Sequence, residues 1–283
     1  MVLVLAAQVI ASIVIFAGYA ALTAGGDFFG SLDRIAGLQS PESLLVFLST
    51  FIGPILVLWL LVPVLHKSRI GAAMMPVPGP LLRDFLIGAA IVWAIMAATV
   101  LLTLPFQSYT PNLSLPAWLG WLVPALMLIF IQVFGEELVF RGYLQPFLAA
   151  RFASPLVWLA VPAVLFGALH WQPAQFGPNA WLVVVATTLM GFVFGTLTAH
   201  TGSIAAAVGV HFANNVTGVL FIATPGELSL LSLYLQPIDL TDVAATRISL
   251  LTNIALIGGA FAVYLWVTRN RPPRLQPIEG VFK

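Results

Sequence analysis

AWLGWLVPALMLIFIQVFGEELVFR, residues 117–141, is the stretch of the chain that decides the fold class. The part before Glu136 carries no charge, and a helix of about 20 such residues crosses the roughly 30 Å hydrocarbon core of a bilayer. Similar apolar blocks recur along the whole chain. We therefore predict an all-α, polytopic membrane protein with about eight transmembrane helices, at residues 2–22, 44–65, 85–105, 117 to the Glu136 region, 155–170, 180–200, 203–223 and 248–268.

The composition agrees with a membrane protein. Of the 283 residues, 60% are hydrophobic and 7% are charged, whereas soluble domains average about 25% charged residues. No soluble domain is visible, so we expect a single membrane domain over residues 1–283. The net charge of +1 gives no electrostatic case for a nucleic-acid partner. The absence of cysteine excludes disulfides, thiolate metal sites and a cysteine nucleophile.

The distribution of cations predicts the orientation in the membrane. With an even number of spans, both termini share one side with the loops after spans two, four and six. Nine cations fall on that side, and two, Arg34 and Arg247, fall opposite. The nine are Lys67, Arg69, Arg83, Arg141, Arg151, Arg269, Arg271, Arg274 and Lys283. Both termini are therefore expected on the cytoplasmic side of a cell membrane, and the residue usage favours a bacterial inner membrane.

Three ionisable residues interrupt the fourth apolar block. Each of Glu136, Glu137 and Arg141 costs about 2.5–3.5 kcal/mol inside a membrane on insertion scales. Glu137 and Arg141 are four residues apart and can pair on one helix face, which leaves Glu136 about 100° around the helix to face another group. The alternative interpretation is a snorkelling cluster at the cytoplasmic end of the span.

Two histidines also lie in apolar blocks. His170 follows Phe166 by four residues and Asn215 follows His211 by four, so each pair shares a helix face. A single histidine of this kind would be interpreted as a packing residue, but two of them together with a glutamate favour a functional site. The other two histidines are expected at the membrane interface: His66 and His200.

A helical hairpin is predicted between the fourth and fifth spans, because a turn at Ser154 and Pro155 separates them. It would put Glu136 and His170 at a similar depth. A straight helix over residues 118–151 would be roughly 50 Å long, which requires tilt or a break within the bilayer. The spacing of Gly191 and Gly195 predicts a close approach between helices.

These residues resemble, in order, the three motifs of the CAAX-protease and bacteriocin-processing family. The matching stretches are Glu136-Glu137-Leu-Val-Phe-Arg141, Phe166-Gly-Ala-Leu-His170 and His211-Phe-Ala-Asn-Asn215. The resemblance covers about residues 134–215, the protease motif core. It implies an eight-helix membrane peptidase in which Glu136 and His170 activate water. It further implies an oxyanion site at His211 and Asn215, with support from Glu137 and Arg141.

Amide hydrolysis needs a base for water and a donor to the tetrahedral oxygen, and this set of residues contains both. The same residues could alternatively form a catalytic zinc site through Glu136, His170 and His211, with water as the fourth ligand. Asn215 is a poor zinc ligand, and we favour the metal-free version.

The predicted function is that of an intramembrane endopeptidase, which hydrolyses a peptide bond of a membrane-associated protein or peptide. One alternative is a non-catalytic membrane scaffold or immunity-type protein of the same fold. Another is a proton or solute transporter, because intramembrane Glu and His often mark relays. No residue pattern identifies the substrate or the cleavage sequence.

Overall fold

The structure is a computed structural model, and it describes residues 2–67 and 80–269. Within these residues, six helices are long and apolar enough to cross a membrane: Val2–Thr23, Pro41–His66, Leu81–Thr103, Leu115–Ala149, Pro173–Thr201 and Val243–Thr268. Two shorter apolar helices, Leu156–Ala168 and Ala205–Phe221, stand where the other two spans were predicted. The prediction of an all-α, polytopic membrane protein is confirmed, and the described residues contain six long and two shorter apolar helices where about eight spans were predicted.

The chain forms two compact units, each assembled from separated stretches of sequence. The first contains Met1–Leu61, Gln107–Val139 and Asn215–Pro237. The second contains Val62–Phe106, Phe140–Asn214 and Ile238–Lys283. The single membrane domain over residues 1–283 stays a prediction.

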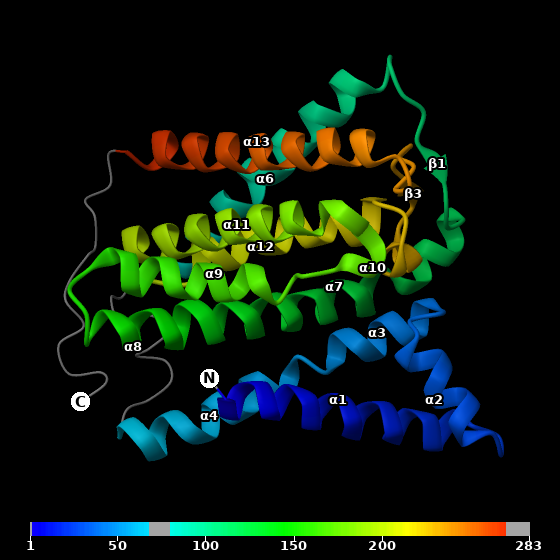
Figure 1. The fold of residues 1–283 in the computed structure, drawn as a ribbon, viewed down its shortest axis with the longest axis horizontal. Helices are drawn as coiled ribbons and strands as arrows, with labels where there is room; N and C mark the ends of the chain where they lie inside the picture. Colours follow the sequence, from blue (N-terminus) through cyan, green and yellow to red (C-terminus); the bar gives the residue numbers. More distant parts are fainter. Residues whose placement is uncertain (1, 68–79, 270–283) are drawn as a thin grey trace. The chain divides into compact units, whose positions relative to one another are not determined.

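The first unit begins with three packed helices, α1 (Val2–Thr23), α2 (Phe28–Ala36) and α3 (Pro41–Ser49), drawn in blue in Figure 1. Ala20, Ile35 and Val46 form their common core. The helix α2 starts at Asp27, whose carboxylate accepts a hydrogen bond from the Gly30 amide at 2.9 Å and so caps the helix. This helix lies between the first two predicted spans, and the sequence analysis did not predict it.

The first unit also contains a small three-stranded sheet. It contains β1 (Thr110–Pro111), β2 (Ile222–Ala223) and β3 (Tyr234–Leu235), with β3 in the middle, antiparallel to β1 and parallel to β2. Strands of two residues leave no recognisable alternation in the sequence, which is why they were not predicted.

The fourth predicted span is one long helical segment with an irregular part. The helix α7 (Leu115–Glu137) passes into the π-helix η1 (Leu138–Leu144) and then into α8 (Gln145–Ala149). The irregular part is a π-helical stretch, a conformation that occurs frequently at functional sites. The tilt or break within the bilayer stays a prediction. The chain then turns and continues as η2 (Leu156–Ala160) and α9 (Val161–Ala168), which confirms the predicted turn at Ser154 and Pro155.

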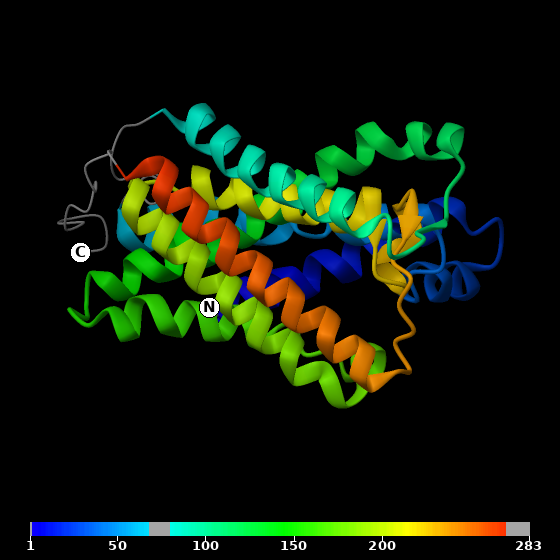
Figure 2. The same cartoon turned by 90° about the horizontal axis from the view of Figure 1, so that it is seen from above.

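Close helix contacts hold the second unit together. Its main elements are α6 (Leu81–Thr103), α9, α11 (Ala180–Thr201), α12 (Ala205–Val216) and α13 (Val243–Thr268). Figure 2 shows α13, in orange and red, running alongside α11, with which it is in contact. A Cβ atom on Gly191 would lie 2.8 Å from the Ala163 Cα atom, so α9 and α11 approach closely. This confirms the close helix approach predicted at Gly191.

The helix α4 (Ile52–His66) follows α3 and forms the larger part of the membrane-length helix Pro41–His66. The remaining elements are short: α10 (Pro173–Phe176), η3 (Gly177–Asn179), η4 (Thr217–Phe221) and η5 (Glu227–Leu231). The helix α11 ends at Gly202, whose φ of 72° is a left-handed conformation that glycine adopts without strain.

The count of loop cations behind the predicted orientation needs one correction. Arg141 is 1% exposed and lies within η1, so it is not a loop cation, and the number of loop cations on that side falls from nine to eight. Four of the others, Arg69, Arg271, Arg274 and Lys283, lie outside the described residues. The cytoplasmic position of both termini stays a prediction.

A glycine substitution tests the contact between α6 and α12. A Cβ atom on Gly209 would collide with the backbone carbonyl oxygen of Phe85 and lie 2.8 Å from its carbonyl carbon. Because backbone atoms cannot rotate away, we expect Gly209→Ala to lower the free energy of unfolding by about 1–3 kcal/mol.

The measurement is a thermal or denaturant melt in detergent, with Gly258→Ala as the control. An added Cβ on Gly258 of α13 meets no described heavy atom within 4 Å. The control should keep or slightly raise stability, by about 0.5–1 kcal/mol, because alanine is the better helix former. Equal melts for the two variants would contradict the close contact.

Candidate active site

The predicted site residues are divided between the two units. The first unit contains Glu136 and Glu137 at the end of α7 and Asn215 on α12. The second contains Arg141 on η1, His170 shortly after α9, and His211 on α12. Within the second unit, these three residues all contact the ring of Phe166. Convergence of Glu136 and Asn215 on the same place stays a prediction.

The orientation of His170 is determined by the end of α9. Its Nδ1 atom lies 2.8 Å from the carbonyl oxygen of Phe166, one helical turn back. A carbonyl oxygen can only accept, so Nδ1 carries the proton and donates it. In the neutral ring, the Nε2 atom then holds the lone pair that can act as a base or bind a metal ion. The ring centroids of Phe166 and His170 are 4.8 Å apart, which restrains the imidazole further.

His211 lies between two phenylalanine rings. Its imidazole stacks on Phe194, with centroids 4.9 Å apart and planes inclined by 20°. It meets Phe166 edge to face, with centroids 5.8 Å apart and planes inclined by 89°. We call Phe166 and Phe194 the aromatic corner. His211 is buried, with 3% of its surface exposed.

The buried cation of Arg141 shares this aromatic corner. Its guanidinium carbon lies 4.6 Å from the centroid of Phe166 and 5.1 Å from that of Phe194. One of its nitrogens donates a hydrogen bond to the Gly191 carbonyl oxygen at 3.1 Å. Ring faces and a carbonyl oxygen present negative charge to the cation, and they offset part of the cost of burying it.

The predicted ion pair between Glu137 and Arg141 assumed a continuous α-helix. The structure has a π-helix from Leu138 onward, which changes the angular offset between positions four residues apart. Both side chains are buried, at 0% and 1% exposure. The ion pair stays a prediction.

Asn215 has a partner that the sequence analysis missed. Its side-chain amide donates a hydrogen bond to the Gln132 side-chain oxygen at 2.9 Å. Gln132 lies on α7, is 8% exposed, and precedes Glu136 by one helical turn. A glutamine in an apolar span was the available signal, because an unsatisfied amide is costly in hydrocarbon.

His66 contacts two aromatic side chains, while its interfacial position stays a prediction. Its Nε2 atom lies 3.2 Å from the Tyr143 hydroxyl oxygen, and its ring contacts those of Tyr143 and Phe147. These contacts link the end of α4 to η1 and α8 within the second unit. The interfacial position of His200 stays a prediction.

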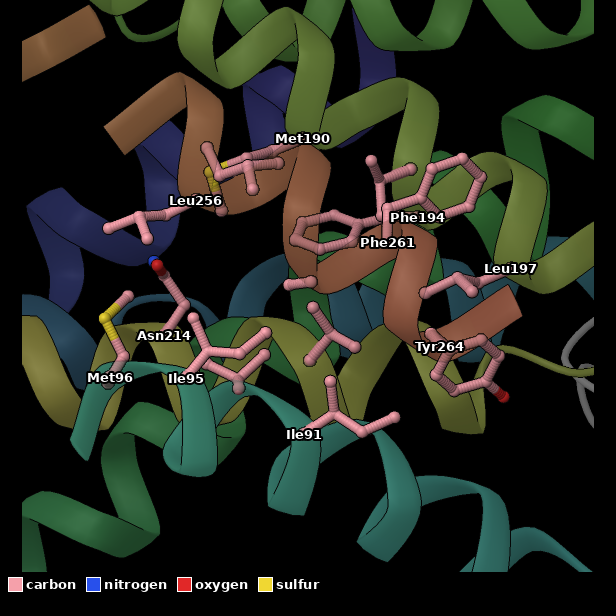
Figure 3. A pocket seen from close by; sticks show the side chains of 15 residues that line it. Ile91, Ile95, Met96, Met190, Phe194, Leu197, Asn214, Leu256, Phe261 and Tyr264 are labelled. Carbon is pink, nitrogen blue, oxygen red and sulfur yellow. The ribbon is translucent and has the colours of Figure 1, made fainter. Parts of the chain in front are cut away.

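An apolar cavity adjoins the aromatic corner. Side chains of α6, α11, α12 and α13 line it, and Figure 3 shows Phe194 and Phe261 among them. Its lining includes one side-chain amide, Asn214, in the residue next to Asn215.

Zinc ligands of the predicted type are chemically present. The Nε2 atom of His170 suits zinc, because metal-bound histidines commonly donate their other ring N–H to a backbone carbonyl. Within either unit, the described residues contain no group of three His, Asp or Glu side chains placed to hold a metal ion. The zinc site stays a prediction.

Comparison with known proteins identifies a family for the central region. Residues 116–217 match the family described as type II CAAX prenyl endopeptidase Rce1-like. A stretch of 111 residues is 36% identical to the uncharacterized protein YyaK of Bacillus subtilis (strain 168), covering 39% of this chain and 36% of that protein. The match thus spans about a third of the relative's length. No solved structure matches the chain.

Replacing Arg141 with lysine tests the buried cation. Lysine keeps the charge but loses the planar group that lies over aromatic rings, so we expect Arg141→Lys to cost about 2 kcal/mol of unfolding free energy. The matched control is Arg151→Lys. Arg151 lies 3.7 Å from the Phe147 centroid but is exposed, so its loss should cost less than about 1 kcal/mol. Melts that do not separate the two variants would refute the role of the aromatic corner.

A double-mutant cycle tests the hydrogen bond between Gln132 and Asn215. We expect Gln132→Leu and Asn215→Leu each to destabilise the protein, and the double variant to lose less than the sum of the two. The expected coupling is about 1 kcal/mol, typical of one net hydrogen bond. Additive losses in melts of the four proteins would show that the two amides do not interact.

Proposed function

We propose that this membrane protein is an intramembrane endopeptidase, because residues 116–217 match the family of Rce1-like type II CAAX prenyl endopeptidases. Its substrate is a membrane-associated protein or peptide, in which it hydrolyses a peptide bond. We place it in a cell membrane, with both termini on the cytoplasmic side.

The observation that carries the proposal is the orientation of His170. A hydrogen bond from Nδ1 to the Phe166 carbonyl oxygen selects the tautomer whose Nε2 atom accepts. A histidine that served only packing would not need one particular nitrogen available. A general base or water-orienting group does need it.

In the proposed reaction, His170 and Glu136 act on one water molecule. The water donates a hydrogen bond to His170 Nε2 and transfers a proton to the Glu136 carboxylate while its oxygen attacks the carbonyl carbon. The tetrahedral intermediate then collapses, the carbon–nitrogen bond breaks, and the proton passes from Glu136 to the leaving nitrogen. The products are a carboxyl terminus and an amino terminus, and Glu136 is again a carboxylate.

His211 and Asn215 are proposed to stabilise the oxyanion of the intermediate. Both carry N–H donors, and both are oriented by neighbours, His211 by the aromatic corner and Asn215 by Gln132. Donors held in place before reaction stabilise developing charge without reorganisation, which makes them more effective than mobile donors. Glu137 and Arg141 are proposed to support the site structurally.

A zinc-dependent version of the same reaction remains the alternative. Glu136, His170 and His211 would hold the metal, which would supply a water of lowered pKa and polarise the carbonyl group. Bound metal is therefore measured in every activity sample.

The test is cleavage of a membrane-peptide library by purified protein in detergent, with melts to confirm folding. We expect Glu136→Gln and His170→Ala to lower kcat/KM by about 10²–10⁴-fold, because each removes a group that acts on the water. For His211→Ala and Asn215→Ala we expect about 10²–10³-fold, as for oxyanion donors. Stoichiometric zinc that disappears with the histidines would favour the metal version.

Two control variants change the same residue types elsewhere. They are His200→Ala, at the end of α11, and Glu227→Gln, at an exposed position of η5. Both should cleave as wild type does. Folded Glu136→Gln and His170→Ala variants with wild-type activity would overturn the assignment of the site.

A further inference from the structure

We infer that Phe194 is a positioning residue, which holds the imidazole of His211 in the orientation needed to donate to the oxyanion. This inference rests on the proposed function. It assigns a role to α11, a helix that carries none of the predicted site residues.

The geometry around His211 fixes the plane of its ring in two ways. Stacking on Phe194 at a 20° inclination resists tilting of the imidazole. Edge-to-face contact with Phe166 at 89° resists rotation within that stack. The two phenylalanine planes are themselves inclined by 71°, so they form a corner rather than a flat wall. An imidazole in such a corner has one preferred plane, and its N–H vectors are directed accordingly.

The same ring takes part in holding the buried cation. The guanidinium carbon of Arg141 lies 5.1 Å from the Phe194 centroid, within the range of a cation–π interaction. Phe194 therefore contacts an imidazole and a cation with one ring, and both contacts depend on an aromatic side chain. A leucine of similar hydrophobicity would fill space but could support neither contact.

Phe194 also borders the apolar cavity between α6, α11, α12 and α13 (Figure 3). Empty space therefore already lies beside the Phe194 ring in the second unit. Substitution by the slightly smaller leucine is therefore expected to leave a folded protein, which makes Phe194→Leu a usable test variant.

The first measurement observes His211 directly and needs no substrate. The chain has four histidines, so ring-labelled histidine gives a simple NMR spectrum in detergent, in which His211→Gln identifies one resonance. A ring stacked on phenylalanine is shifted upfield by the aromatic ring current. We expect Phe194→Leu to abolish this shift and Phe192→Leu, two residues away on the same helix, to preserve it. A His211 resonance that Phe194→Leu does not move would overturn the inference.

The second measurement separates positioning from packing in catalysis. We expect Phe194→Leu to lower kcat by about 10- to 100-fold with little change in KM, because misplacement affects the transition state more than substrate binding. Replacement of Phe194 with trifluorophenylalanine keeps the shape and weakens the negative ring face, so kcat should fall. The melt should show a folded protein of slightly lower stability, because the contact with Arg141 weakens as well. Phe192→Leu should keep wild-type kcat.

The two measurements distinguish failure of the inference from failure of the proposed function. If wild type cleaves and the Phe194 variants retain its kcat, the positioning role is wrong and the endopeptidase proposal stands. If the His211 shift depends on Phe194 but wild type cleaves no peptide or membrane-associated protein, the endopeptidase proposal is wrong. The contact between Phe194 and His211 then has no role in catalysis.

Discussion

The burial of a guanidinium charge is the constraint on which the arrangement of the second unit depends. Arg141 is 1% exposed in a segment that is otherwise apolar, so its neighbours must replace the water that it has lost. Rings of Phe166 and Phe194 and the carbonyl oxygen of Gly191 do so. These groups come from α9 and α11, two helices whose backbones approach closely at Gly191 and Ala163. Small residues in α9 and α11 permit that packing.

Phe166, which supports the Arg141 cation, also contacts both histidines of the second unit's predicted site. Phe166 contacts Arg141 with its ring, accepts the His170 hydrogen bond with its backbone oxygen, and meets His211 with the same ring. One residue thus links a structural charge to two groups proposed for chemistry. A substitution that weakens the contacts of Arg141 should therefore disturb the orientation of both imidazoles. The stability of this unit is in this way coupled to its proposed activity.

In the first unit, neutral polar groups also find partners within the protein. Asn215 on α12 donates a hydrogen bond to the side-chain oxygen of Gln132 on α7. The Trp118 indole N–H donates to the Leu220 carbonyl oxygen at 2.6 Å, where η4 ends. In hydrocarbon, each polar group needs a partner within the protein, so such pairs specify which helices lie together. The apolar surface cannot do this, because lipid tails and leucine side chains are equally apolar.

The sequence by itself determined the class of fold, the approximate positions of the membrane helices and the identity of the polar residues that require explanation. These follow from the length of the apolar blocks and from the cost of charge in hydrocarbon, both of which are properties of local sequence. Tertiary structure alone decided that η1 is π-helical, that Gln132 pairs with Asn215, and that Phe194 stacks on His211. The reason is that these features depend on contacts between helices far apart in the chain, and a phenylalanine in an apolar span looks the same whether it faces lipid or an imidazole.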